Sequence, residues 1–510
     1  MPKALGTIIS TLEGPNTGGF SFVVSDNSVR RGQFVVAETE NGRLVASVSD
    51  IFRANRYFDR PESVFEYERR PSESSFGDHF PASEWEYTVA QCSALGLFEN
   101  GALRRNSFPP SPGAKVFEAD EDLLKKVLQF DDRGLFVGKL LQHGVDARLS
   151  MTRLFQKHLA ILAMSGAGKS VLASVLIEEL LKREKPGLAC LVFDVHGEYV
   201  GFADKKKNPA FASKTMVVDG EKVRIAASRL TAPMVAEFMP EMSAAQVRDL
   251  EDVLESLKKK MKSEDAAFDL DDVLGEITAS EMKENVKAPL LAWVGGLKKL
   301  RLFGKADYPS AGDAVRQGGL TVFDLSDTVS QKKRQVILAY FTKRFFNLRR
   351  ANSVPPFLLL VEEAHNFCRE KAPRGGSLSK GIIETVAREG RKFGASLCLV
   401  SQRPVQLSTT ALSQCNTFII LRVTNPYDLE HIGQSCEAID AGVQGQITTL
   451  KVGEGIIIGE AVGGTPVFVA FRNRESVPAK AATLEEMAEK YSGEKSAAAQ
   501  LSDDDLDAFL

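Results

Sequence analysis

The sequence is poor in cysteine. Its 510 residues include six cysteines, and no two of them form a C-x-x-C pair. Cys190, Cys398 and Cys415 lie in or beside apolar runs, where cysteine is most simply a small buried hydrophobe. The pattern indicates neither a disulfide framework nor paired zinc ligands, and it favours a reducing compartment.

Long apolar runs and an excess of one charge are also missing. No stretch approaches 18 consecutive apolar residues, and the start, MPKALGTIIS, lacks the apolar core of a signal peptide. We therefore expect a cytoplasmic protein with no membrane partner. The formal net charge is −3. Any surface that binds nucleic acid must therefore be local, because no global positive field exists to attract one.

The first 150 residues are rich in short β-favouring runs. Residues 1–115 contain GTIIS, GFSFVVS, GQFVVAET and GRLVASVSDIF, separated by turn residues, which predicts a small β-barrel for assembly or partner docking. The polar, irregular stretch 53–81 is expected to be a long loop. Residues 116–150 are interpreted as a connector with one amphipathic helix over 121–128.

From residue 158 the pattern changes to strands alternating with helices, which indicates an α/β fold with a parallel-rich sheet. We assign residues 151–230 and 306–480 to this core. Residues 231–305 have helical periodicity and no β-runs, so they are expected to form an all-helical insertion. Residues 481–510 end in SDDDLDAFL, for which solvated disorder and docking on a partner are both open.

The core begins with HLAILAMSGAGKSV, residues 158–171, in which an apolar strand meets a small-residue loop and then a helix. Such a loop binds a triphosphate through backbone N–H groups at the helix N-terminus. The strict pattern GxxxxGK[ST] is broken by Ala163, which is tolerable at negative φ. A chance turn between strand and helix is the alternative. The candidate ATP-binding residues are Gly166, Ala167, Gly168, Lys169, Ser170 and Val171.

A second strand, FLLLV, runs into two carboxylates, Glu362 and Glu363. This arrangement resembles the acidic strand end that lies beside the phosphates in P-loop enzymes. Glu362, with Ser170, would hold Mg²⁺, partly through water, and Glu363 would activate the attacking water. The alternative is a strand that merely ends in a charged turn.

Polar groups follow three further elements. Asp194, His196 and Glu198 come after a buried strand, where they could be ligands or a loop cap. Gln402 ends the strand ASLCLVS and could hydrogen-bond the γ-phosphate or the water. Arg391 is either an ordinary helix C-terminal charge or an arginine finger offered to a neighbouring subunit.

The ordered set HLAILAMSGAGKS, FDVHGEY, LVEEAH, AREGRKFG, VSQRP and VGEGIIIG resembles the HerA family of hexameric DNA-pumping ATPases, in the FtsK-like group of RecA-like P-loop motors. The resemblance covers essentially the whole chain. It implies that Glu363 is the catalytic glutamate and that Arg391 acts in trans. Lys157 falls where relatives can carry an arginine near the nucleotide, and Ile458 and Gly459 match a late segment that contacts it.

The resemblance also implies partners and a function. It predicts a homohexamer around double-stranded DNA that uses ATP and Mg²⁺, with a NurA-like nuclease or another effector on the barrel face. The C-terminal segment would brace the neighbouring subunit. The function expected is ATP-driven DNA translocation in end resection and recombinational repair. Two alternatives stay open: an ATP-controlled ring scaffold that activates an effector in phage defence, and a ring ATPase that acts on proteins.

Overall fold

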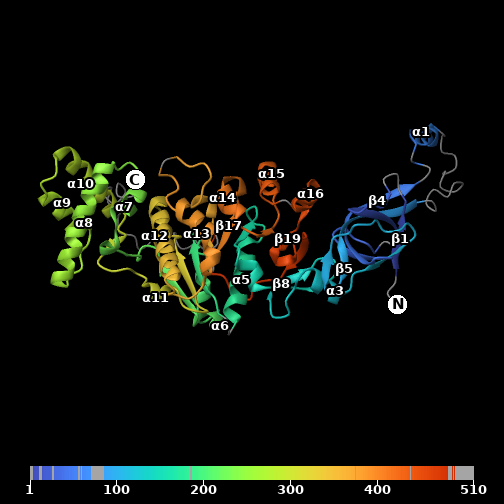
Figure 1. Ribbon diagram of the computed structural model, residues 1–510, viewed down its shortest axis with the longest axis horizontal. Helices are drawn as coiled ribbons and strands as arrows, with labels where there is room; N and C mark the ends of the chain where they lie inside the picture. Colours follow the sequence, from blue (N-terminus) through green and yellow to red (C-terminus); the bar gives the residue numbers. More distant parts are fainter. Residues whose placement is uncertain are drawn as a thin grey trace.

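The computed structural model describes residues 4–10, 14–25, 28–55, 58, 60–69, 86–183, 187–373, 375–436, 438–479, 485 and 488. The elements are arranged along one long axis (Figure 1). A β-barrel lies at one end, a large sheet covered by helices lies in the middle, and a helical unit lies at the far end. Within the described residues, no helix combines the length and apolar character needed to cross a membrane.

The barrel confirms the prediction for the first part of the chain. Its strands are ordered β2-β1-β7-β3-β4-β5, and β5 pairs back with β2, which closes the circle. Alternate residues such as Phe22, Val35 and Leu44 are fully buried inside it. The strands are β1 (Ala4–Ile9), β2 (Gly19–Val24), β3 (Phe34–Thr39), β4 (Gly42–Asn55), β5 (Glu86–Glu99) and β7 (Lys115–Glu118), with β6 (Ala102–Arg104) added beside β5.

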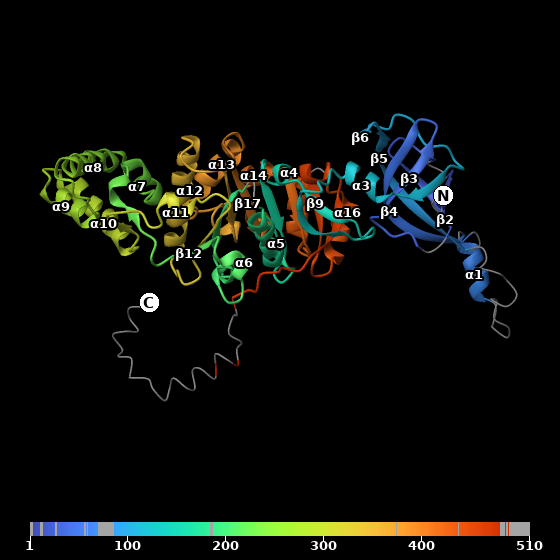
Figure 2. The same cartoon turned by 90° about the horizontal axis from the view of Figure 1, so that it is seen from below.

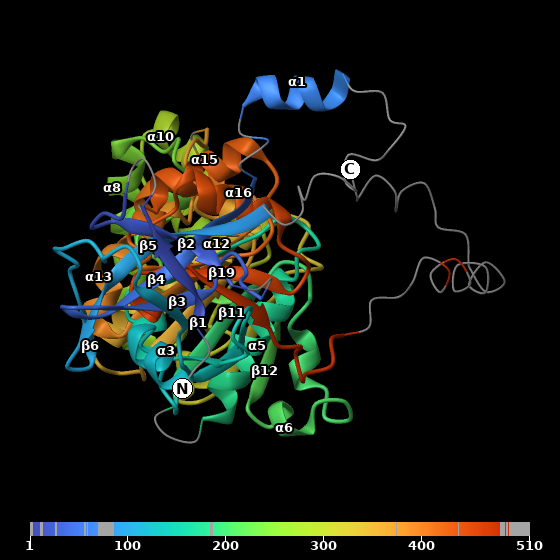
Figure 3. The same ribbon diagram turned by 90° about the vertical axis from the view of Figure 1, so that its right-hand side faces the viewer.

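The expected loop over residues 53–81 is partly wrong. Strand β4 continues to Asn55, which pairs with Glu86 of β5, and helix α1 (Pro61–Arg69) follows. Pro61 is favourable at the first helical position because it has no N–H to leave unpaired. Helix α1 stands away from the barrel (Figure 3). Residues 70–85 lie outside the described part.

The large sheet is ordered β12-β15-β11-β16-β17-β10-β18-β19-β20-β8-β9. From β12 to β18 all neighbours are parallel, and the remaining strands are antiparallel. The strands are β8 (Leu135–Leu140), β9 (Asp146–Leu149), β10 (Leu159–Leu162), β11 (Ala189–Asp194), β12 (Thr215–Asp219), β15 (Leu320–Asp324), β16 (Phe357–Val361), β17 (Ala395–Ser401), β18 (Thr417–Ile420), β19 (Glu454–Gly459) and β20 (Val467–Phe471). Their near-continuous apolar sequences fit a sheet that is buried on both faces.

The stretch interpreted as a connector contains more than the predicted helix. Helix α3 (Glu121–Val127) is present, with Asp120 capping its N-terminus through Leu123 N. However, β8 and β9 extend the large sheet, since β8 pairs with β20. These two short strands lack a strong sequence pattern, and the partner of β8 in the sheet lies more than three hundred residues further along the chain.

Helices cover both faces of the sheet (Figure 2). One face carries α5 (Lys169–Lys182), whose Leu172, Leu176 and Ile177 are buried against the strands. The other face carries α12 (Gln331–Arg350), α13 (Lys380–Phe393), α14 (Thr409–Ser413), α15 (Pro426–Ser435) and α16 (Ala441–Thr449). The ends of the parallel strands therefore lie between the two helix layers. We call the side where these strands end the carboxyl edge and the side where they begin the amino edge.

The helical insertion is present, although the predicted all-helical range 231–305 ends in a short strand, β14 (Phe303–Gly304), which pairs with β13 (Ile225–Ala226). The insertion contains α7 (Ala232–Phe238), α8 (Ala244–Glu264), α9 (Leu270–Ala279) and α10 (Glu284–Lys299). Capping boxes begin two of these helices, at Ser243 with Gln246 and at Asp269 with Asp272, which satisfies their first free N–H groups. The insertion lies at the opposite end of the molecule from the barrel (Figure 1).

Candidate active site

The predicted phosphate loop connects β10 to α5 at the carboxyl edge of the parallel strands. Gly166 and Gly168 have φ values of 76° and 99°, a region that favours glycine. Ala163 keeps negative φ and donates its N–H to Ser401 O at 3.2 Å. Alanine therefore replaces the usual glycine without strain, and α5 begins at Lys169, directly after the loop.

Lys169 and Glu363 are brought together across the site, with Lys169 Nζ in direct contact with Glu363 Oε1. Glu363 follows β16 and has a φ of 47°, an unfavourable value for a residue with a side chain. His365 Nδ1 lies 3.3 Å from Glu363 Oε2, and His196 Nε2 lies 3.8 Å from Glu363 Oε1. Strained backbone beside buried charge is typical of functional sites.

The neighbouring carboxylates are buried. Asp194 accepts hydrogen bonds from the backbone N–H groups of Gly197 and Tyr199, both at 2.8 Å. Of the two open interpretations, Asp194 therefore has the contacts of a loop cap, whereas His196 faces Glu363. Glu362 is fully buried and accepts from Val195 N at 3.1 Å. Burial, together with the nearby carboxylates Asp194 and Glu198, raises the pKa of Glu362 to about 10.

The donor set at this edge fits a hydrated Mg²⁺ ion. Glu362 Oε1 and Glu198 Oε2 are buried without a hydrogen-bond donor among the described residues. Carboxylate oxygens and water are the ligands that Mg²⁺ prefers. Among the described residues no three carboxylate or histidine side chains form a metal cluster, so the ion would be held by Glu362 and by Ser170, at the start of α5 on the same edge, with phosphate oxygens and water as its other ligands.

Gln402 also emerges at this edge. In the parallel pairing of β10 with β17, Leu162 is the partner of Ser401, so Gln402 leaves the sheet beside the phosphate loop. Ser401 Oγ accepts from Arg403 N at 3.1 Å and lies 3.1 Å from His365 Nδ1. The strand end that carries Gln402 is thus linked to the histidine beside Glu363.

Three other predicted contacts lie at the opposite, amino edge. Leu159, the first residue of β10, pairs with Thr417, which pairs with Gly459. Strand β10 has four residues, so Gly459 lies about 10 Å or more from the phosphate loop of the same chain. Ile458 is buried in the core, and Lys157 Nζ pairs with Glu460 Oε2 at 2.6 Å. None of these three residues lies beside the phosphate loop of its own chain, and their contact with a nucleotide stays a prediction.

Arg391 lies at the amino edge too, in the last turn of α13. It lines an open hollow of about 610 Å³ with other basic residues. The lining residues are Gln156, Arg350, Arg388, Glu389, Arg391, Lys392 and Phe393. Helix α13 leads directly into the amino end of β17. Arg391 therefore lies at the opposite end of the parallel strands from Lys169 of the same chain.

The sequence analysis missed the turn at residues 451–453, between α16 and β19. A Cβ placed on Gly168 would lie 3.8 Å from Gly453 N, so this turn adjoins the phosphate loop. The turn includes Val452 and Gly453, the first two residues of the motif VGEGIIIG, whereas the predicted contacts Ile458 and Gly459 are its last two. Strand β19 runs antiparallel to β18, and its first residues, not its last, therefore reach the carboxyl edge.

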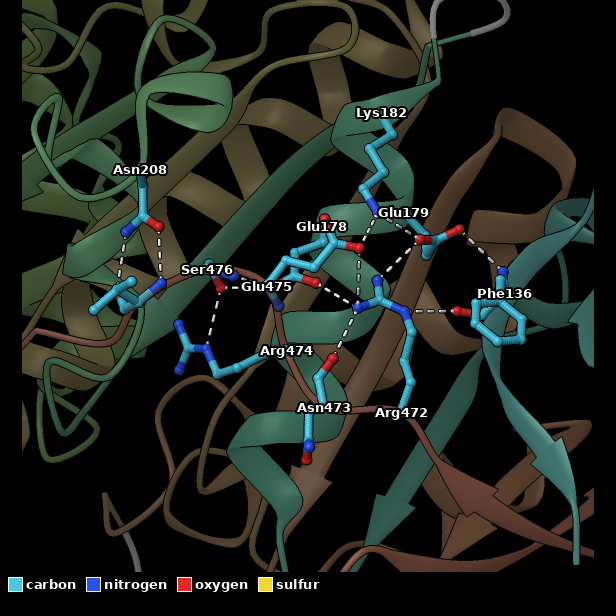
Figure 4. A network of polar contacts seen from close by, with 11 residues as sticks. Phe136, Glu178, Glu179, Lys182, Asn208, Arg472, Asn473, Arg474, Glu475 and Ser476 are labelled. Carbon is cyan, nitrogen blue, oxygen red and sulfur yellow. Dashed lines mark hydrogen bonds and ion pairs between the residues drawn. The ribbon is translucent and has the colours of Figure 1, made fainter.

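Helix α5 is held in place by a segment that follows β20 (Figure 4). Arg472 donates to Glu178 Oε2 at 2.8 Å, to Glu179 Oε1 at 2.9 Å and to Phe136 O at 3.1 Å. Glu178, fully buried, also accepts from Ser476 N at 2.7 Å. Although burial raises the pKa of Glu178, these hydrogen bonds outweigh it and hold the pKa below its usual value.

The sequence offers two basic segments as candidate DNA contacts, residues 205–207 and the loop 369–380, and they differ in structure. Lys205, Lys206 and Lys207 are exposed after the short helix that follows β11. In contrast, Lys380 lies 3.6 Å from Glu370 Oε2 and 3.8 Å from Glu384 Oε1. The charge of Lys380 is therefore largely offset within the chain.

Comparisons with known proteins agree with this geometry. Residues 135–345 match the family model described as "Helicase HerA, central domain". The chain is 29% identical to the DNA double-strand break repair helicase HerA of Pyrococcus furiosus, over 91% of each chain. It is 26% identical to a probable helicase of Methanocaldococcus jannaschii, over 84% of each chain.

Among solved structures, VirB4 of Thermoanaerobacter pseudethanolicus superimposes with a TM-score of 0.53 and 15% identity. The alignment covers 70% of this chain and 99% of VirB4, which shows a shared fold. Together these matches confirm the resemblance to the HerA family, and the chain is a P-loop ATP hydrolase.

Proposed function

We propose that this HerA-family ATPase is a double-stranded DNA translocase that assembles as a ring of six and works with a NurA-like nuclease in end resection and recombinational repair. The observation that carries the proposal is the division of the site between two edges of one sheet. Lys169 and Glu363 lie at the carboxyl edge, and Arg391 lies at the amino edge. An arginine finger at the amino edge is too far from the phosphate loop of its own chain, so it can act only on the nucleotide of another copy.

In the proposed mechanism, Lys169 and the loop N–H groups bind the phosphates of ATP. Glu363 exchanges its contact with Lys169 for the attacking water, from which it removes a proton. Gln402 hydrogen-bonds the γ-phosphate or the same water. Arg391 of the adjacent subunit offsets the charge that develops in the transition state. Ser170 and Glu362 would hold Mg²⁺, which neutralises phosphate charge when bound.

The DNA partner is supported by relatives rather than by a charged surface. Several relatives carry the name "DNA double-strand break repair helicase HerA". The exposed lysines 205–207 are candidate contacts to DNA phosphates. Such contacts bind with little sequence preference and weaken with salt.

The test combines ATP turnover with movement on DNA. We expect double-stranded DNA to stimulate ATP hydrolysis, and we expect the protein to displace a triplex-forming strand in an ATP-dependent manner that Lys169→Ala abolishes. Native mass spectrometry should show six copies. Turnover without DNA stimulation would favour a protein substrate. DNA-stimulated turnover without triplex displacement would favour a scaffold that activates an effector, as in phage defence.

A further inference from the structure

His365 lies between the ends of two neighbouring strands that carry polar groups of the site. It belongs to the short 3₁₀ turn Ala364–Asn366 after β16. Its Nδ1 atom lies 3.3 Å from Glu363 Oε2 and 3.1 Å from Ser401 Oγ, the last residue of β17. Ser401 is fully buried, and the His365 side chain is 7% exposed. One buried nitrogen atom therefore joins the carboxylate that would activate water to the strand end that precedes Gln402.

The surroundings of Nδ1 decide which ring nitrogen of His365 carries the proton. A neutral histidine has one donor nitrogen and one acceptor nitrogen. A lone pair on Nδ1 would face the negative Glu363 oxygen and be repelled, whereas an N–H there is attracted. Ser401 Oγ already accepts from Arg403 N at 3.1 Å, and its second lone pair accepts as well. Nδ1 is therefore the donor nitrogen, with two oxygen atoms close to it.

The Glu363 carboxylate needs such a donor, because the proposed mechanism removes its contact with Lys169. Lys169 Nζ touches Glu363 Oε1 in the structure, and it would turn to the phosphates when ATP binds. Asn366 N donates to Glu363 O at 2.8 Å, which fixes the backbone but leaves the side-chain torsions free. His196 Nε2 lies 3.8 Å from Glu363 Oε1, beyond hydrogen-bond distance. His365 is a buried donor that stays within reach.

We propose that His365 is a positioning residue for hydrolysis: its Nδ1–H, shared with Ser401 Oγ, donates to Glu363 Oε2 and turns Oε1 toward the attacking water. This role rests on the proposed function and adds to it a group that acts through Glu363 without touching ATP. Because Ser401 directly precedes Gln402, a shift of this strand end would move His365 as well. The group offered to the γ-phosphate and the group that activates water are thereby linked.

The first test compares three substitutions of His365. Steady-state ATP hydrolysis by the full chain would be measured with Mg²⁺ and double-stranded DNA. His365→Ala should lower kcat roughly twenty- to a hundredfold and leave the KM for ATP within about twofold, because the carboxylate loses its orientation while the phosphate contacts remain. In His365→Asn the amide nitrogen is bonded to Cγ, as Nδ1 is, so this variant should keep about a third of kcat or more. His365→Gln carries its amide one bond further out and should fall with the alanine variant.

A double-variant cycle separates positioning from a general structural loss. Adding His365→Ala to Glu363→Gln should not lower the residual turnover further, because the residue through which His365 acts is already changed. His143→Ala is the matched control. The His143 side chain is 3% exposed, accepts from Phe34 N at 2.8 Å, and follows β8, which is four strands from β10 in the sheet. This variant should leave kcat unchanged.

Three results would overturn the inference while leaving the ATPase site in place. They are a kcat within about threefold of the unaltered protein in His365→Ala, an equal loss in His365→Asn and His365→Gln, and losses that multiply in the double variant. The comparison of His365→Asn with His365→Gln decides if the alanine variant does not fold. Turnover retained in Glu363→Gln would instead show that the proposed site is wrong, and the inference with it.

Discussion

The two edges of the parallel strands carry opposite kinds of side chain. At the carboxyl edge, carboxylates gather around a single lysine in a buried and strained setting, with Glu363 in contact with Lys169. At the amino edge, an open hollow is lined by three arginines and a lysine, with Glu389 as the one carboxylate among the lining residues. One edge is therefore suited to bind and hydrolyse a nucleotide, and the other to offer cations to one.

In the proposed ring, each chain would hold two halves of two different active sites. The hollow cannot supply its cations to the phosphate loop of the same chain, because the length of β10 separates the edges. Charge complementarity would direct the amino edge of one copy to the carboxyl edge of the next. The predictions below test the two edges separately.

The largest effect is expected at Glu363. In Glu363→Gln, ATP turnover should fall by roughly a thousandfold or more, because the amide cannot accept the proton of the attacking water. ATP binding should persist, and filter binding would measure it. The exposed Glu430 on α15 offers a control, since Glu430→Gln should leave turnover unchanged. Turnover retained in Glu363→Gln would exclude the proposed role of this edge.

Arg391→Ala should lower turnover by roughly a hundred- to a thousandfold while leaving ATP bound, because the transition-state charge loses its partner. Arg388→Ala, on the same helix and 4.0 Å from Glu384, should keep most activity. Mixing Lys169→Ala with Arg391→Ala subunits should restore part of the turnover, measured as phosphate release. A complete lack of recovery would contradict the assignment of the two edges to one shared site.

Arg472→Ala tests how firmly the carboxyl edge is held. Removing this guanidinium leaves the buried Glu178 without its charged partner, so the free energy of unfolding should fall by about 3 kcal/mol. Denaturant titration would measure the loss. Lys182→Ala, which removes a surface cation from the same network, should cost less than about 1 kcal/mol. Equal losses in the two variants would mean that Glu178 does not depend on Arg472.

His158, at the amino edge, should make stability depend on pH. Its buried ring accepts from Leu397 N at 3.0 Å and lies 2.9 Å from Ala387 O, and burial lowers its pKa to about 4. The unfolded chain takes up the proton near pH 6.5, so stability present above that pH is lost as the pH falls toward 4. The total loss should be about 3 kcal/mol. The pH dependence should flatten in His158→Gln, and thermal unfolding from pH 7.5 to 4.5 would show whether it does.

The smallest effect is expected for Lys157. Its ion pair with Glu460 is partly exposed, so Lys157→Ala and Glu460→Ala should each change the free energy of unfolding by less than about 1 kcal/mol. If Lys157 reaches the nucleotide of an adjacent copy, Lys157→Ala should raise the KM for ATP a few-fold and Glu460→Ala should not. Steady-state kinetics would distinguish the two variants. Equal KM values for ATP would show that Lys157 does not contact the nucleotide of an adjacent copy.

Much of the architecture was predictable because it rests on local pattern. Short β-favouring runs separated by turn residues predicted the barrel, and helical periodicity predicted the insertion, whose helices α8 and α9 begin at capping boxes. The phosphate loop and the two acids after β16 are each encoded by a few consecutive residues. Within each motif the residues act together, so the motif can be recognised from the sequence alone. Such short motifs predict their own geometry before any distant part of the chain is placed.

Long-range pairing decided the rest. The edge at which a residue emerges depends on strand direction and register, so the antiparallel course of β19 placed Val452 and Gly453 beside the phosphate loop and Gly459 away from it. The same kind of pairing drew β8 into the sheet. A contact such as that of Arg472 with Glu178 joins residues 294 apart in the sequence. The sequence by itself thus determined which chemistry the chain carries, and only the tertiary structure decided on which edge each group is displayed, because strand pairing alone sets that position.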